Sequence, residues 1–162
     1  MLSQKMQDAL NAQINAEAYS ANLYLAMSAH AHSMNLEGFA HWFRKQYEEE
    51  TAHMLKFVSY LLDRRGTVEL KAINAPPAQW ESMLAMFEAT MKHEEHVTQL
   101  IHNLADQAAA ERDHATSAFL QWFVSEQVEE EATVDSILQK LRTSKDSIGG
   151  LLVLDHHVGK RA

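Results

Sequence analysis

The sequence contains no cysteine, and only five glycines and two prolines occur among its 162 residues. The lack of cysteine excludes disulfides and thiolate metal ligands. Because glycine and proline interrupt helices, their scarcity predicts a chain that is helical almost throughout. Hydrophobic residues make up 46% of the chain, which is enough for the core of one domain. We therefore expect residues 1–162 to form a single all-α domain.

Long apolar runs and a basic surface are also missing. No stretch of 18 apolar residues occurs, so we expect no membrane partner. Residues 1–8 lack the apolar centre of a signal peptide, which makes a cytoplasmic location the default expectation. The 22 acidic and 14 basic residues give a formal charge of −8. This balance argues against nucleic acid as a partner and suits a protein that attracts cations.

Apolar residues recur at helical spacing in four long segments and one short segment. Ser3 and Asn35 are suitable N-caps for the first two helices, and Gly66 is a suitable stop for the second. Pro76 and Pro77 forbid helix at their positions, which leaves a connection long enough to cross a bundle. The expected helices are residues 4–33, 36–64, 78–109, 112–143 and about 146–155.

The lengths of the connections predict the topology. Short turns within the first and second pairs of helices predict two antiparallel hairpins, and the long connection predicts that the chain crosses the bundle between them. The short apolar segment 148–153 is the centre of the expected fifth helix. The tail from Asp155 to Ala162 is expected to fray, as chain ends commonly do.

One polar pattern occurs twice in the chain, with a shift of 77 residues. The first copy consists of Glu17, Glu50 and His53, and the second of Glu94, Gln127 and Glu130. In each copy the second residue follows the first by 33 positions, and the third lies three positions further, on the same helical face. Two helix pairs that each direct carboxylates inward are typical of carboxylate-bridged di-iron bundles.

The four glutamates of this pattern each interrupt an apolar stripe at the middle of a long helix. A single glutamate at such a position usually belongs to a solvated face, but four in register favour another explanation. Buried carboxylates without cations would each destabilise the fold by on the order of several kcal/mol. A pair of metal ions removes this conflict. Carboxylates with one imidazole suit iron better than copper or structural zinc, so we predict a dinuclear iron centre.

Three further glutamates, Glu49, Glu126 and Glu129, adjoin the pattern. Glu126 lies three residues before Glu129 and four before Glu130, so these side chains share a helical face. They predict a flanking third metal site, although an ordinary acidic surface is the alternative. Tyr24 lies two turns from Glu17 on the same stripe and is either a core residue or an electron donor beside the metals.

With these residues the chain resembles the bacterial non-haem ferritins over nearly its whole length. The residues that carry the resemblance are Glu17, Tyr24, Glu49, Glu50, His53, Glu94, Trp122, Glu126, Gln127, Glu129 and Glu130. The resemblance implies a ferritin-like four-helix bundle with a long crossover between the second and third helices and a short fifth C-terminal helix. It also implies a homo-oligomeric shell of 24 subunits with the fifth helix at the four-fold axes.

The resemblance further implies a ferroxidase that oxidises Fe(II) with O2 or H2O2 and deposits ferric mineral inside the shell. One iron of the dinuclear centre would be held by Glu17, Glu50 and His53. The other would be held by Glu50, Glu94 and Glu130, with Gln127 nearby. The third iron site would use Glu49, Glu126, Glu129 and Glu130.

Two departures from related families bear on the cofactor and on the path of iron. Bacterioferritins carry Glu-x-x-His in both halves and a haem-ligating Met directly after the first of these glutamates. Here the second motif is Gln127-x-x-Glu130 and Thr51 follows the first glutamate, so no haem is expected. The acidic pair that lines the three-fold pore of animal ferritins falls at Ser117 and Leu120, which leaves the way in for iron unassigned.

Two other functions are compatible with a helical bundle of this kind. One is a rubrerythrin-like di-iron oxidase or peroxidase without storage, which the missing second histidine and the missing Cys-x-x-Cys electron-transfer motif disfavour. The other is a bundle that acts only by binding a partner. Iron loading in air separates the three functions, because a shell retains hundreds of irons, an oxidase about two and a plain bundle none.

Overall fold

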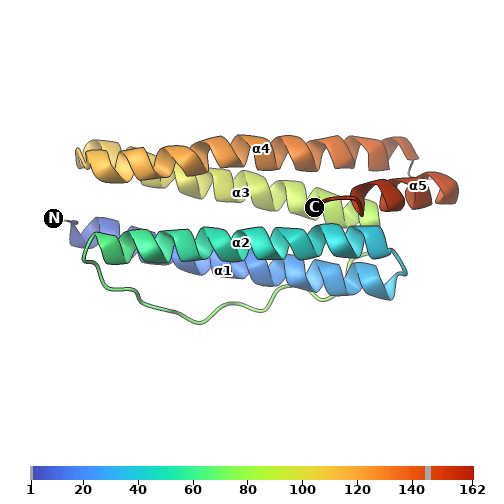
Figure 1. Ribbon diagram of the computed structural model, residues 1–162, viewed down its shortest axis with the longest axis horizontal. Helices are drawn as coiled ribbons and strands as arrows, with labels where there is room; N and C mark the ends of the chain where they lie inside the picture. The colour runs from blue at the N-terminus through green and yellow to red at the C-terminus, as the bar shows by residue number, and fades with distance from the viewer. Residues whose placement is uncertain (1, 145–146) are drawn as a thin grey trace.

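The computed structural model describes residues 2–144 and 147–162, and these form five helices. The helices are α1 (Gln4–Ser33), α2 (Glu37–Asp63), α3 (Met83–Ala110), α4 (His114–Ser144) and α5 (Ile148–Val158). The hairpins α1–α2 and α3–α4 pack into a four-helix bundle, and the short α5 lies at one end (Figure 1). The predicted all-α bundle with a long crossover and a short fifth helix is confirmed.

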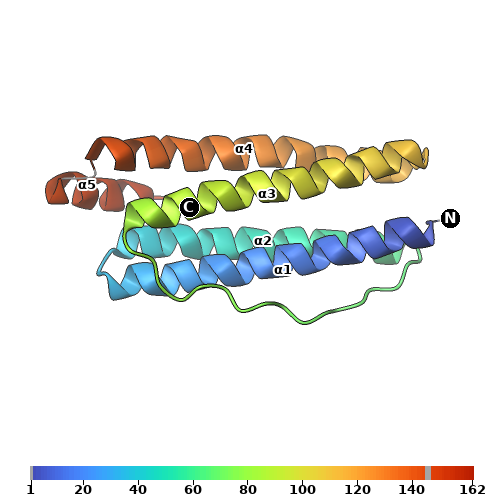
Figure 2. The same ribbon diagram turned by 180° about the vertical axis from the view of Figure 1, so that it is seen from behind.

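The connection between the two hairpins, residues 64–82, runs along the length of the bundle (Figures 1 and 2). Two asparagines of α1 hold it in place. The side-chain amides of Asn11 and Asn15 donate to the backbone carbonyls of Thr67, at 2.9 Å, and Ala72, at 3.1 Å. The crossover is therefore fixed to α1 through its own backbone groups, which an extended segment must satisfy outside itself.

Helix bounds differ from expectation mainly at α3, which begins at Met83 instead of residue 78. Ser82 sets this start, because its hydroxyl accepts a hydrogen bond from the backbone N–H of Ala85 at 3.1 Å. The ends of α1, α2 and α4 lie within two residues of those expected. The fifth helix extends to Val158, and its expected first residue, 146, lies outside the described residues.

The N-terminus of α2 is capped differently from the prediction. Asn35 does not cap this helix, because it has a φ of 58° and lies in the turn before it. The N-cap residue is Leu36, which has no side chain able to accept a hydrogen bond. Instead the carboxylate of Asp155, in α5, accepts from the backbone N–H of Phe39 at 2.9 Å. A negative charge at this end also complements the helix dipole.

The prediction that the tail from Asp155 frays is wrong, because this segment is docked against α2. Leu154 and Val158 are buried in the core. The close approach depends on Gly38, where a Cβ atom would lie only 1.8 Å from the backbone oxygen of Asp155. Beyond α5, the ring Nε2 of His41 donates to the backbone carbonyl of Arg161 at 2.7 Å. Burial and hydrogen bonds thus override the usual mobility of a chain end.

The apolar core is divided into two clusters along the bundle axis. The cluster nearer α5 includes Tyr24, Met27, Phe39, Phe43, Phe87 and Leu138. The cluster at the opposite end includes Leu10, Ile14, Phe57, Ile101, Leu104 and Phe123. Between them every long helix contributes one buried glutamate. Within residues 2–144 and 147–162, no helix is long and apolar enough to cross a lipid bilayer.

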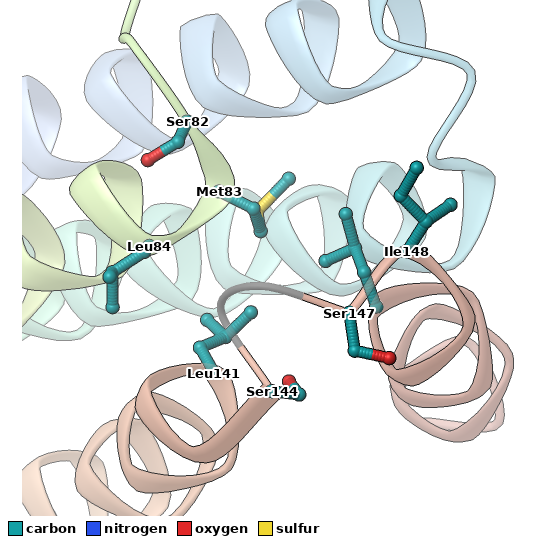
Figure 3. Close-up of a pocket in the computed structure, with 8 residues that line it drawn as sticks. Ser82, Met83, Leu84, Leu141, Ser144, Ser147 and Ile148 are labelled. Carbon is teal, nitrogen blue, oxygen red and sulfur yellow. The ribbon is translucent and has the colours of Figure 1, made fainter.

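A pocket of about 250 Å³ lies at the α5 end of the bundle, where the starts of α3 and α5 meet the end of α4 (Figure 3). Its described lining consists of serine, leucine, methionine and isoleucine side chains, such as Ser82, Met83 and Ile148. It contains no charged group among these residues and is separate from the layer of buried glutamates.

Replacing Gly38 by alanine should detach α5 from α2. The added Cβ overlaps the carbonyl oxygen of Asp155, and overpacking of this kind costs about 1–3 kcal/mol. Hydrogen exchange of the backbone amides of residues 154–158 should accelerate by about tenfold or more. Gly149→Ala is the control, because a Cβ there meets only the hydroxyl of Ser147, at 4.0 Å. Wild-type protection in the Gly38→Ala protein would contradict this account of the docking.

Candidate metal centre

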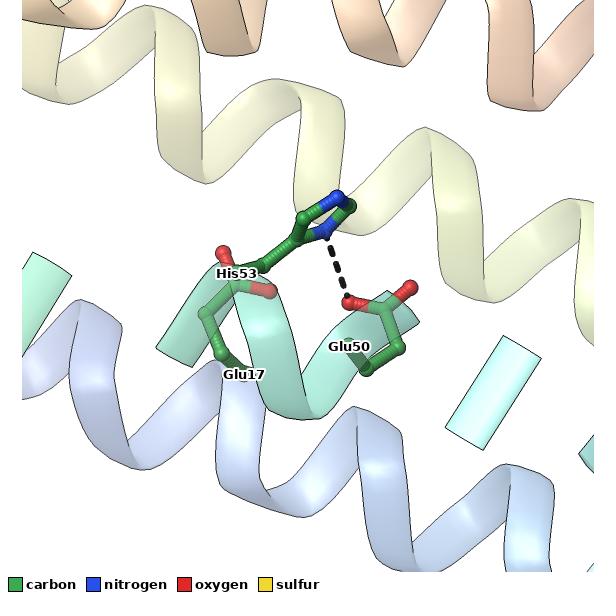
Figure 4. Close-up of side chains that lie close together, drawn as sticks. All are labelled: Glu17, Glu50 and His53. Carbon is green, nitrogen blue, oxygen red and sulfur yellow. Dashed lines mark hydrogen bonds and ion pairs between the residues drawn. The ribbon is translucent and has the colours of Figure 1, made fainter. Parts of the chain in front are cut away.

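Three potential metal ligands from the first hairpin converge at the middle of the bundle (Figure 4). Glu50 and His53 lie one turn apart on the inner face of α2, and Glu17 faces them from α1. One ligand atom from each lies within 4.8 Å of the others. The Nδ1 of His53 is 3.3 Å from Oε2 of Glu50. All three side chains are buried, so a cation held here would be largely shielded from water.

A second group of potential ligands shares His53 with the first. It consists of His53, Glu126 and Glu130, whose ligand atoms also lie within 4.8 Å of one another. The Nε2 of His53 is 3.9 Å from Oε1 of Glu126. Glu130 is buried, whereas the side chain of Glu126 is 26% exposed. Nδ1 of His53 therefore faces Glu50 of the first, buried group, and Nε2 faces Glu126 of the second group, which is partly open to solvent.

Glu94, the buried glutamate of α3, belongs to neither compact group. The hydroxyl of Tyr24 donates to one of its carboxylate oxygens, and the amide of Gln127 donates to the other at 3.2 Å. The set expected for the second iron, Glu50, Glu94 and Glu130, is therefore not one of the compact groups among the described residues. Its carboxylates face the same layer, but Tyr24 and Gln127 hold the Glu94 carboxylate toward themselves.

Two glutamines that the sequence reasoning did not assign to the site also belong to this layer. The amide of Gln13 donates to Oε1 of Glu17 at 2.8 Å. The amide of Gln46 donates to Oε2 of Glu130, on α4, at 3.0 Å. Each glutamine stands four residues before a glutamate of the pattern, Glu17 or Glu50, and this i, i+4 spacing is the signal that could have identified them.

Unsatisfied acceptors show that the layer lacks positive charge. Oε2 of Glu17 and Oε1 of Gln46 are buried without a hydrogen-bond partner. In the described part of the chain, none of the four buried glutamates forms an ion pair with lysine or arginine. Buried acceptors of this kind are normally satisfied, and metal ions would satisfy them. The donor set of carboxylates and one imidazole therefore fits iron.

Burial raises the pKa of each carboxyl group in the layer. The pKa of Glu17 rises to about 7, and that of Glu130 rises to about 8, where the charge of Glu94 adds to the effect of burial. Burial also raises the pKa of Glu94, and it raises the pKa of Glu50 well above the usual range, reinforced by the charges of its neighbours. Metal binding must therefore displace protons from these carboxyl groups.

His53 and Tyr24 are both neutral at pH 7. Burial, reinforced by the charge of Lys56, lowers the pKa of His53 to about 4, so a ring nitrogen is free to bind a metal ion. Burial raises the pKa of Tyr24 well above its ordinary value, so the phenol keeps its proton and can donate to Glu94. His53 therefore meets the protonation requirement of a ligand, and Tyr24 that of a hydrogen-bond donor.

The three flanking glutamates occupy different environments. Glu126 belongs to the second compact group, Glu129 is exposed, and the side chain of Glu49 is 44% exposed. The charges of Glu129 and Glu49 add to burial in raising the pKa of Glu126. Glu49 has a cationic partner, since Nη2 of Arg161 lies 2.5 Å from its carboxylate.

Comparisons with known proteins agree on one family. A model described as a ferritin-like domain matches residues 7–144. A bacterial non-heme ferritin of Bacteroides fragilis (strain 638R) is 43% identical over 161 residues, which cover 99% of this chain and 100% of the relative. One from Staphylococcus aureus (strain MRSA252) is 37% identical, with 99% and 97% covered. An open-pore ferritin from the hyperthermophilic archaeon Archaeoglobus fulgidus superposes with a TM-score of 0.99 at 46% identity, over 100% of both chains.

The raised pKa of Glu130 predicts how the stability of the metal-free protein depends on pH. The folded protein holds this proton up to about pH 8, whereas an unfolded chain releases it near 4.5. The contribution is therefore complete below pH 4.5 and is lost as the pH rises toward 8. In thermal scans of chelator-treated protein, the midpoint should fall between pH 5 and 8.5, and Glu130→Gln should make this fall shallower.

The exposed neighbour of Glu130 provides the control for this measurement. Glu129→Gln removes the same kind of charge from a solvated position and should retain the wild-type pH dependence. If Glu130→Gln and Glu129→Gln give the same slope as wild type, the Glu130 carboxyl group does not hold its proton in the folded protein.

Proposed function

The chain belongs to the ferritin family, and on that premise we propose that it stores iron and oxidises Fe(II) to Fe(III) at the buried carboxylate layer. The observation that carries the proposal is the burial of Glu17, Glu50, Glu94 and Glu130 in mid-bundle without lysine or arginine partners in the described chain. Such a layer requires cations, and its donor set suits iron. In this proposal Fe(II) is the substrate and ferric mineral is the product.

We assign one Fe(II) to Glu17, Glu50 and His53, and the other to Glu50, Glu94 and Glu130. The compact first group supports the first assignment directly. The second assignment requires the Glu94 carboxylate to turn from Tyr24 toward the shared ligand Glu50. Gln127 stays beside this second position, where its amide donates to Glu94. Glu50 would bridge the two irons, as its place between Glu17 and the second hairpin allows.

The side chains of the layer contribute electrostatic stabilisation and proton release. Each Fe(II) loses one electron, and two of them reduce one O2 to H2O2 with the uptake of two protons. Carboxylates held around the metals by the four helices stabilise the positive charge that iron gains on oxidation. The carboxyl groups of Glu17 and Glu130, whose pKa values are about 7 and 8, release protons when iron binds.

The two halves of the centre are chemically different, which suits a site whose product leaves. In the second copy of the pattern Gln127 replaces a glutamate and Glu130 replaces a histidine. The second position therefore differs from the first in its donor atoms and in its geometry. We propose that this asymmetry favours the transfer of oxidised iron to the mineral instead of its retention as a cofactor.

A homo-oligomeric shell of 24 subunits completes the proposal, and the outer face of α5 supports it. Ile148 and Val153 are 80% and 71% exposed, and Leu152 on the same short helix is also exposed. An apolar patch of this kind fits contact with further copies of the chain. The shell would enclose the mineral that the subunits produce.

Glu17→Ala should abolish rapid oxidation of Fe(II) while leaving the bundle folded. Glu17 is the ligand from α1, and its removal leaves the first iron with two side chains. We expect the initial rate to fall by about 100-fold or more, at least as much as the loss of an outer partner of a metal ligand. Stopped-flow absorbance after mixing with Fe(II) in air measures the rate. Glu95→Ala, an exposed position beside Glu94, is the matched control.

Iron retention distinguishes storage from other uses of the same centre. After aerobic loading, the assembled protein should carry hundreds of irons or more and elute as one large species. Retention of about two irons per subunit would favour a di-iron oxidase of the rubrerythrin type, and retention of none would leave only a helical bundle. Wild-type oxidation rates in Glu17→Ala would reject the assignment of the centre.

Combined replacement of Glu49, Glu126 and Glu129 by alanine should leave the dinuclear centre active and alter later steps. These side chains are not among the ligands assigned to the two irons, but Glu126 lies in one compact group with Glu130, and the charges of Glu49 and Glu129 act on Glu126. Anaerobic titration should show one fewer Fe(II) bound per subunit. Oxygen-electrode measurements should show a changed ratio of Fe(II) oxidised per O2 consumed. If the binding stoichiometry and this ratio both match wild type, the three glutamates are an ordinary acidic surface.

A further inference from the structure

The chain segment after α5 places a cation at the edge of the candidate metal centre. In Figure 1 this segment turns back from α5 and ends over the half of α2 that is nearer α5. Two contacts fix its course. Gly159 packs against Gly38, where a Cβ atom on Gly159 would lie 2.9 Å from the Cα of Gly38. The backbone carbonyl of Arg161 accepts from His41 at 2.7 Å. The position of Arg161 is therefore set by the backbone.

The guanidinium of Arg161 makes three contacts with α2. Its Nη2 lies 2.5 Å from Oε2 of Glu49, its Nη1 donates to the backbone carbonyl of Trp42 at 3.4 Å, and its central carbon lies 4.9 Å from the centre of the Trp42 ring. Its side chain is only 22% exposed. A charge-assisted hydrogen bond combined with stacking on an indole is stronger than an ordinary surface ion pair.

Glu49 is one of the glutamates that flank the dinuclear centre. It directly precedes Glu50 in the chain, and its charge contributes to raising the pKa values of Glu94, Glu126 and Glu130. Arg161 has the opposite effect on Glu130, whose pKa it lowers. The guanidinium therefore acts on the same carboxylates that would receive a flanking metal ion.

We propose that Arg161 competes with iron for Glu49, so that a metal ion entering the flanking site must first displace the guanidinium. The inference rests on the flanking site proposed above. Arg161 is a positioning residue here, because it acts through Glu49 and not on the reacting metals. Among residues 2–144 and 147–162, no lysine or arginine pairs with Glu17, Glu50 or His53, so the dinuclear centre fills first and the flanking site fills only at higher Fe(II).

The competition is reversible because Arg161 has other partners. When a metal ion takes the Glu49 carboxylate, stacking on Trp42 and the backbone hydrogen bond from His41 keep the guanidinium close. When iron leaves, the ion pair between Arg161 and Glu49 re-forms readily, because the chain end is already held in place. Within the flanking site, Glu49 thus returns to its ion pair with Arg161 after each passage of iron, whereas Glu129 stays solvated.

Arg161→Gln should tighten the binding of the third Fe(II) by about 3- to 10-fold, the range expected for one partly buried, charge-assisted pair. The affinities of the first two Fe(II) should not change. Anaerobic Fe(II) titration of the assembled protein by calorimetry measures all three. Lys160→Gln is the matched control, because it removes an equal charge from the adjacent, exposed position and should behave as wild type.

Two further variants separate the effect of charge from detachment of the tail. Arg161→Lys keeps the positive charge and should remain close to wild type. Glu49→Gln should weaken binding of the third Fe(II). Adding Arg161→Gln to Glu49→Gln should cause no further change in that affinity, since Arg161 acts through Glu49. Equal tightening in Arg161→Lys and Arg161→Gln, or wild-type affinity in Arg161→Gln, overturns the inference.

Combined replacement of Glu49, Glu126 and Glu129 distinguishes failure of the flanking site from failure of the competition. If replacing Glu49, Glu126 and Glu129 removes no Fe(II), the flanking site fails and the role of Arg161 falls with it. If that replacement removes one Fe(II) per subunit but Arg161→Gln changes nothing, only the competition is wrong.

Discussion

The structure depends on one constraint, which is that four carboxylates must be buried at the middle of an apolar bundle. Their neighbours meet part of this requirement with neutral donors, namely Gln13, Tyr24, Gln46 and Gln127. The polar layer also splits the apolar core into two clusters, and these must hold the helices together on either side of it. Burial of apolar surface therefore stabilises the scaffold, while the layer between the clusters stays ready for cations.

Neutral donors and a neutral histidine suit a site that must bind metal and then release it. Had lysine or arginine satisfied Glu17, Glu50, Glu94 and Glu130, a metal ion would have had to displace a fixed charge at every position. Arg161 lies at the edge of this region and pairs with Glu49. The buried carboxylates at the centre of the layer therefore lack a cationic side chain in the described chain, whereas Glu49 at its edge is paired with Arg161.

The sequence predicted what depends on spacing along a single helix and missed what depends on contacts between distant elements. The i, i+3 step from Glu50 to His53 lies within one helix, and the repeat of Glu17 in Glu94 is a comparison of two stretches of sequence, so both could be recognised without the fold. The Asp155 cap of α2 joins residues 116 positions apart, and the Arg161–Glu49 pair joins residues 112 apart. No propensity of Asn35 or of a chain end indicates such pairs, because they arise from the faces that packing brings together.

The division of ligands between the hairpins has a consequence for local unfolding. Glu17, Glu50 and His53 all belong to α1 and α2, whereas the second compact group joins His53 of α2 to Glu126 and Glu130 of α4. A fluctuation that separates the hairpins would open the second group and spare the first, because only the second spans the long loop closed by the crossover. The backbone amides of α1 and α2 should therefore exchange slowly under conditions in which Glu17, Glu50 and His53 still hold a metal ion.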